Sequence, residues 1–138
     1  MNIIKETEVA YVTERISRSW IDIARQGLTF EEFNQLFESA PFKLADWAFM
    51  LGISVRSLQR YQKSGSRFGM SESEKLLMLG HLFNRGREVF GDSDRFFLWL
   101  EKPAPSLNGR HPKELLDSMF GIQLIIDQLG RIEHGIVA

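Results

Sequence analysis

The chain has 138 residues, of which 43% are hydrophobic and 25% charged, and its formal net charge at pH 7 is -1. This composition is typical of a globular protein with one full core or two small ones, and it argues against intrinsic disorder. The lack of cysteine excludes disulfide bonds, thiolate zinc clusters and a cysteine nucleophile. A net charge this close to zero also excludes a generic polyanion binder.

The N-terminal segment has no feature of a targeting sequence. Its first thirty residues carry charges throughout, from Lys5 and Glu6 to Arg25, and therefore contain neither the apolar core of a signal peptide nor a membrane span. Together with the lack of cysteine, this predicts a cytoplasmic protein without a membrane partner.

Helical periodicity runs through the first third of the chain. Apolar residues spaced along 9–24, including Val9, Ile16 and Trp20, predict a first helix that Gly27 ends. A short second helix is predicted before Pro41. Its start carries the capping-box pattern, which is made by Thr29 and Glu32.

Residues 44–61 have the pattern of a helix-turn-helix. Ala48 supplies a small side chain where two helices cross, Gly52 can take a positive φ at the turn, and Ser54 can cap the second helix. The second helix is expected to bury Val55 and Leu58, with Tyr61 as a further candidate. The polar residues that remain available for base edges and phosphates are Lys43, Ser54, Arg56, Ser57, Gln59, Arg60 and Lys63.

Charge is distributed unevenly along the chain. The stretch 43–68 has a net charge of +4, whereas residues 71–138 sum to -2. The first stretch can therefore face phosphate, and the second has no such bias. The alternative interpretation of residues 44–61, on this evidence about equally weighted, is a helical hairpin with an ordinary solvated basic face.

The second half of the chain is also predicted to be helical. A capping box formed by Ser71 and Glu74 is expected to open a long apolar helix that ends near Gly91. A short helix over 96–100 follows, and prolines then enforce a break over 103–105.

Two more helices complete the prediction. The first begins at Pro112 and continues to Gly121, and the last begins near Leu124 and fades at Gly135. No strand-like alternation competes with these helices, so the predicted fold class is all-α. The expected domains are residues 1–70 with the helix-turn-helix at about 43–63, a connecting helix over 71–91, and a small helical domain over 92–138.

No catalytic, metal or cofactor site is predicted. His81, His111 and His134 lie far apart without the spacing of metal ligands. The chain also lacks a nucleophile elbow and the glycine-rich motifs that cradle phosphates. These observations argue against an enzyme.

The C-terminal motifs resemble those of a known family. After the helix-turn-helix and a long helix come Phe96-Phe97-Leu98-Trp99-Leu100, Pro105-Ser106-Leu107-Asn108-Gly109, Pro112-Lys113-Glu114-Leu115-Leu116-Asp117, Gly121 and Leu129-Gly130-Arg131-Ile132-Glu133-His134-Gly135. This order resembles the Xre/MbcA/ParS-type antitoxins from about Phe30 to Ile136. The resemblance implies an Xre-like N-terminal helix-turn-helix domain that dimerises and binds operator DNA. It also implies a C-terminal domain that binds a RES-type toxin, which consumes NAD, or a ParT-like toxin, which transfers ADP-ribose.

The final helix is the expected toxin-binding element. An inhibitor that occludes a substrate entrance favours a convex helix with apolar anchors and a few charges. The residues expected to approach the toxin are Ile125, Arg131, Ile132, Glu133, His134, Gly135 and Ile136. Helical spacing alone instead favours Ile125 and Ile132 as core residues, with Arg131 and Glu133 on a solvated surface.

Three function classes are compatible with these patterns. The leading one is an antitoxin that binds both a toxin and operator DNA, working as a homodimer or as a larger complex with its toxin, because two-fold symmetric proteins read paired half-sites. The second is a free-standing helix-turn-helix regulator whose C-terminal domain only oligomerises. The third is an enzyme that uses isolated His and Asp residues.

Overall fold

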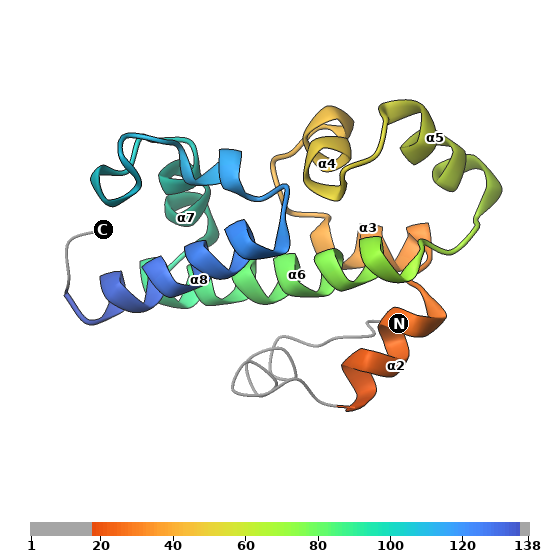
Figure 1. The fold of residues 1–138 in the computed structure, drawn as a ribbon, viewed down its shortest axis with the longest axis horizontal. Coiled ribbons are helices and arrows are strands. Elements are labelled where there is room, and N and C mark those ends of the chain that lie inside the picture. The colour runs from red at the N-terminus through yellow and green to blue at the C-terminus, as the bar shows by residue number, and fades with distance from the viewer. Residues whose placement is uncertain (1–17, 136–138) are drawn as a thin grey trace. The chain divides into compact units, whose positions relative to one another are not determined.

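The computed structural model describes residues 18–135, and every regular element in that range is a helix. The α-helices are α2 (Arg18–Gln26), α3 (Phe30–Phe37), α4 (Leu44–Leu51), α5 (Val55–Ser64), α6 (Met70–Phe90), α7 (Ser93–Leu100) and α8 (Met119–Glu133). Two short 3₁₀ helices, η1 (Pro105–Leu107) and η2 (Pro112–Leu115), lie between α7 and α8 (Figure 1). The all-α prediction is confirmed for this part of the chain, and Val9 and Ile16 lie outside it.

The chain divides into two compact units, residues 1–81 and 82–138, with the boundary inside α6. Each unit has its own set of buried apolar side chains. None of the helices in residues 18–135 is long and apolar enough to cross a membrane.

An aromatic cluster holds the core of the first unit together. The ring of Trp47 on α4 lies 5.0 Å from that of Phe33 and 4.7 Å from that of Phe37, both on α3. Edge-on and tilted ring pairs at such distances stabilise a core beyond their buried area. The capping box at the start of α3 is confirmed, because the Thr29 hydroxyl accepts from the Glu32 N–H while the Glu32 carboxylate accepts from the Thr29 N–H.

The second unit packs α7, η1 and η2 around the last helix. The ring of Phe96 packs closely against Gly86 on α6. A Cβ on residue 86 would lie only 2.2 Å from a carbon atom of this ring, so glycine permits the contact. Gln128, which is buried on α8, accepts a 2.9 Å hydrogen bond from the Ser106 hydroxyl of η1. The buried apolar residues of this unit are Leu82, Phe96, Leu100, Ala104, Leu107, Leu116, Ile122, Ile125 and Leu129.

Two predicted helix boundaries are wrong. The first concerns α6, which begins at Met70 rather than after a Ser71–Glu74 capping box. The N–H of Gly69, the residue before the helix, donates to the Glu72 carboxylate at 3.1 Å. The acidic residue that accepts at the start of α6 is therefore Glu72 and not Glu74, which was expected.

The second wrong boundary lies at the start of the last helix. Residues after Pro112 form only the short η2, and α8 begins at Met119, so Gly121 lies inside the helix instead of ending one. The Ser118 hydroxyl caps α8 by accepting from the Gly121 N–H at 3.0 Å. A Cβ on Gly121 would lie 1.6 Å from the carbonyl oxygen of Leu115, so glycine here permits close packing rather than a helix end.

Candidate functional site

The turn between α4 and α5 has the geometry that the sequence predicts. Gly52 adopts φ 70° and ψ 31°, and its N–H donates to the carbonyl oxygens of Ala48 and Phe49. The Ser54 hydroxyl accepts from the N–H of Ser57 at 3.0 Å and caps α5. Ala48 is buried with 4% exposure. All three features expected of a helix-turn-helix at this point are confirmed.

The packing of α5 matches the prediction in part. Leu58 is fully buried. Tyr61 is half-buried, and its ring centroid lies 4.6 Å from that of Phe68. The expectation that Val55 is buried is wrong, because its exposure is 38%. Val55 is the first residue of α5, and at this end of the helix neighbouring side chains leave it uncovered.

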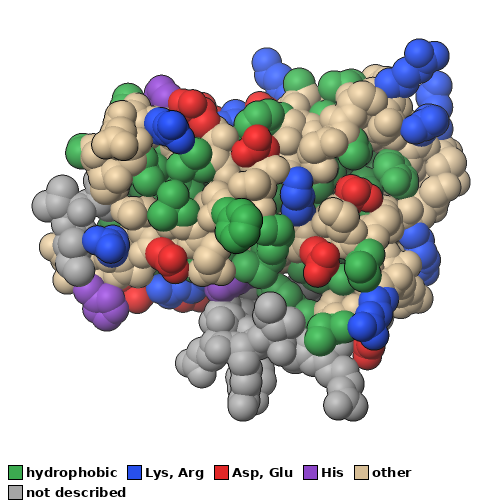
Figure 2. All heavy atoms as spheres, in the orientation of Figure 1, with side chains coloured by type: hydrophobic (Ala, Val, Ile, Leu, Met, Phe, Trp, Pro, Cys, Tyr) green, Lys and Arg blue, Asp and Glu red, His purple; other side chains and the backbone are tan. Residues whose placement is uncertain are grey.

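The outer face of α5 carries a basic stripe, which we define as Arg56, Arg60 and Lys63. All three are exposed, and their spacing of four and three residues places them along one side of the helix. Figure 2 shows Lys and Arg side chains gathered over α5. No Asp or Glu forms an ion pair with this stripe among residues 18–135.

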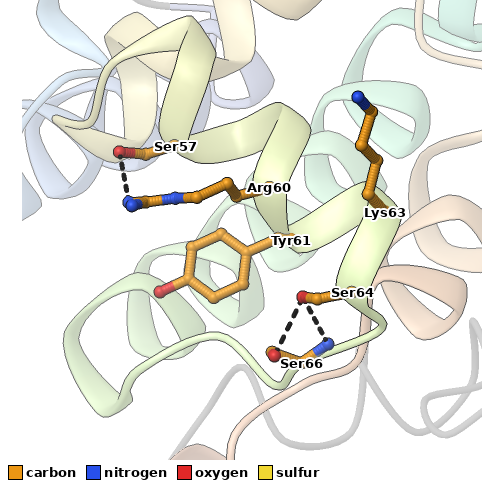
Figure 3. A pocket seen from close by; sticks show the side chains of 6 residues that line it. All are labelled: Ser57, Arg60, Tyr61, Lys63, Ser64 and Ser66. Atoms are coloured by element: carbon orange, nitrogen blue, oxygen red, sulfur yellow. Dashed lines mark hydrogen bonds between the residues drawn. The ribbon is translucent and has the colours of Figure 1, made fainter.

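An open pocket of about 550 Å³ lies beside the C-terminal half of α5. Figure 3 shows Arg60 extended toward Ser57, whose hydroxyl accepts a 3.2 Å hydrogen bond from Nη2 of Arg60, while Lys63 extends in another direction. The pocket is lined by Ser57, Arg60, Tyr61, Lys63, Ser64 and Ser66. Sequence reasoning did not single out Ser64 and Ser66, which form hydrogen bonds with each other at the C-terminal end of α5.

The other residues of the predicted DNA-binding set also lie at the surface of the first unit. Gln59 and Lys43 are exposed. Lys43 directly precedes α4, and its N–H donates to the carboxylate of Asp46 at 2.9 Å. Ser54 is exposed, but its hydroxyl is already engaged as the cap of α5.

The end of α8 presents several of the predicted toxin-binding residues. Arg131, His134 and Gly135 are exposed, and Ile132 is half-buried. Ile125 has no exposed surface, so it belongs to the core of its own unit and is not available for contact there. The core alternative is therefore correct for Ile125. Ile136 lies outside the described residues.

Glu133 is part of an ion pair within the second unit. Its two carboxylate oxygens accept from the guanidinium of Arg85 on α6 at 3.0 and 3.3 Å. These hydrogen bonds lower the pKa of Glu133 and raise the pKa of Arg85. Arg85 also forms an ion pair with Glu88 on α6 at 3.1 Å. The Arg85 guanidinium thus bridges the two carboxylates and links the end of α8 to α6.

Sequence reasoning missed an aromatic residue that is almost fully exposed. Phe120 was expected inside a helix from Pro112 to Gly121, but it lies in the first turn of α8 with 92% exposure. The signal was present in the sequence. With Ser118 as the cap, the apolar positions Ile122, Ile125 and Leu129 define the buried face, and Phe120 falls outside it.

Comparisons with known proteins agree with this architecture. Residues 85–135 match the model of the antitoxin Xre/MbcA/ParS C-terminal toxin-binding domain. Proteins named antitoxin Xre from Yersinia enterocolitica and Photorhabdus laumondii are each 27% identical to the chain over 117 residues. Both alignments cover 84% of this chain and 79% of the relative. The chain is therefore similar to Xre-type antitoxins over most of its length, and its residues 85–135 match the C-terminal toxin-binding domain of the Xre/MbcA/ParS antitoxins.

Proposed function

We propose that this protein is the antitoxin of a type II toxin-antitoxin pair and neutralises a RES-type or ParT-like toxin by binding it directly. The observation that carries this proposal is the match of residues 85–135 to a toxin-binding domain. The second unit forms a packed helical body there, and α8 leads directly to the exposed residues at its end.

Neutralisation of this kind needs no catalysis by the antitoxin. A protein that covers a substrate entrance has only to bury a patch on its partner and match a few charges. Arg131 and His134 are exposed and can donate hydrogen bonds to carboxylate or other polar groups on the toxin. Glu133 contributes differently, because its ion pair with Arg85 fixes the helix end that presents them. We propose that this end of α8, with the residues after it, lies at the toxin's active site.

The test is co-purification of the full chain with the product of the adjacent gene, followed by truncation. Deleting residues 134–138 removes the proposed tail but keeps Glu133 and its ion pair with Arg85. A stable complex that weakens on truncation supports the proposal. A complex of unchanged affinity would place the toxin contact elsewhere on the domain, and the lack of any complex would favour a free-standing regulator.

We also propose that the protein represses its own operon through the basic stripe on α5. This second function rests on the geometry of the turn at Gly52 and on the exposed Arg56, Arg60 and Lys63, which suit the major groove and its flanking phosphates. Two copies related by a two-fold axis would read two half-sites about one helical turn apart.

The operator proposal is tested by replacing Arg56 and Arg60 with alanine. Operator affinity should fall, and the dependence of log K on log salt should become shallower by about one unit for each phosphate that the variant no longer binds. The matched control replaces two exposed cations of the second unit, Lys102 and Arg110, with alanine and changes the net charge equally. An equal fall in operator affinity in both double variants would show only an effect of total charge and would contradict the proposal. The variant with Arg56 and Arg60 replaced should still bind the toxin.

A further inference from the structure

The first two turns of α8 leave an apolar patch uncovered. Phe120 is 92% exposed, Leu124 is 41% exposed and the adjacent Met119 is 39% exposed. Phe120 and Leu124 are four residues apart and therefore neighbours on the helix surface. Figure 2 shows hydrophobic side chains at the surface where α8 begins. Single exposed apolar side chains are common at protein surfaces, whereas neighbouring exposed apolar side chains that form a patch point to an interaction site.

The backbone that carries Phe120 is held firmly. The hydroxyl of Ser118 caps this turn through the N–H of Gly121. The close approach of Gly121 to the carbonyl of Leu115 then packs the same turn against η2. A side chain mounted on such a turn loses little backbone entropy when it binds, which is the property of a preorganised anchor.

The same face of α8 continues from apolar to charged. Asp127 and Arg131 follow Phe120 and Leu124 at helical spacing, and all four side chains are exposed. From Phe120 to Arg131 the helix rises about 16 Å, which fits within one side of an interface of standard size. An aromatic anchor beside a polar border is the usual composition of a protein interface.

We propose that Phe120 is the apolar anchor of the toxin interface and that it inserts, with Leu124 beside it, into a hydrophobic pocket on the toxin. This inference rests on the proposed antitoxin function. The toxin is the occupant that the position favours. The patch lies within the domain matched as toxin-binding, and the face that carries it runs directly to Arg131, which we propose above as a toxin contact.

The test is the affinity of the full chain for the purified product of the adjacent gene, measured by calorimetry for the wild type and for Phe120→Ala. The dissociation constant should rise at least 30-fold, which corresponds to about 2 kcal/mol. The thermal unfolding midpoint should stay unchanged because the ring is 92% exposed. The matched control is Phe49→Ala, which removes a 47% exposed phenyl ring from α4 of the first unit and should leave toxin affinity unchanged.

Each contrary result has a distinct meaning. If the wild type itself does not bind the adjacent product, the antitoxin function and this inference both fail. Tight wild-type binding that Phe120→Ala leaves unaltered overturns the anchor alone. Analytical ultracentrifugation tests whether the patch instead joins two copies of this chain. If the wild type is a homodimer, and Phe120→Ala is a monomer that keeps its toxin affinity, the patch serves self-association and the inference is overturned.

Discussion

Replacing Gly121 with alanine should destabilise the second unit even though alanine is the better helix former. Helix propensity alone favours the change by about 1 kcal/mol. The new Cβ, however, would lie 1.6 Å from the Leu115 carbonyl oxygen, and contacts below 3.0 Å essentially never occur. The first turn of α8 must therefore move away from η2 by about 1.4 Å, the difference between those two distances.

This displacement has two costs. Forcing an extra methyl group into a packed site costs about 1–3 kcal/mol. Misalignment of the Ser118 cap adds about 1 kcal/mol, because its hydroxyl bonds to the N–H of Gly121 itself. After the gain in propensity, the free energy of unfolding of Gly121→Ala should be lower by about 1–3 kcal/mol.

The same helix supplies the control. Gly130 has no atom within 4 Å of an added Cβ, so Gly130→Ala should raise the free energy of unfolding, by up to about 1 kcal/mol. Urea unfolding followed by circular dichroism gives both values, and amide hydrogen exchange locates the weakened region. If both substitutions stabilise the protein equally, the close approach of Gly121 to Leu115 is refuted.

Two further predictions concern local interactions. Thr29→Ala removes the cap of α3 and should lower the free energy of unfolding by about 1 kcal/mol in urea, and an unchanged midpoint would mean that the capping box contributes nothing. Glu133→Gln should lower the urea midpoint at pH 7 and should lower it less near about pH 3. The hydrogen bonds from Arg85 depress the pKa of Glu133, so the stabilisation is complete above the unfolded-state pKa of about 4.3 and is lost as the pH falls through the lower folded-state value. A midpoint difference that is the same at both pH values would contradict this linkage.

Local sequence signals predicted much of the fold because they act over only a few residues. The box at Thr29, the turn at Gly52 and the cap at Ser54 each depend on groups within four positions of one another. Such short-range chemistry can be identified before any tertiary contact is known.

The wrong predictions concern positions whose environment is set by tertiary contacts. Gly121 resembles a helix end in the sequence, but its real constraint is the carbonyl of Leu115, which no helical periodicity reveals. Ile125 was expected at the toxin contact, yet its side chain lies in the core of its own unit. The exposure of Val55 likewise depends on where neighbouring elements end, whereas that of Phe120 follows from the start of α8 after Ser118.

The two candidate sites differ in how far they can be predicted from the sequence. The basic stripe on α5 follows from the spacing of Arg56, Arg60 and Lys63 alone. The ion pair between Arg85 and Glu133 joins residues 48 positions apart and could not be predicted locally. That pair gives Glu133 a structural role that its place in a C-terminal motif does not reveal.

The most direct test of the proposed antitoxin function is the cellular NAD level and growth of cells that express the adjacent gene product alone or together with this full chain. We expect growth arrest from the adjacent product alone and recovery on co-expression, with NAD falling and recovering in parallel if the toxin is of the RES type. Recovery without any change in NAD would assign a ParT-like, ADP-ribosylating partner. Arrest that co-expression of the chain does not relieve would contradict the antitoxin function.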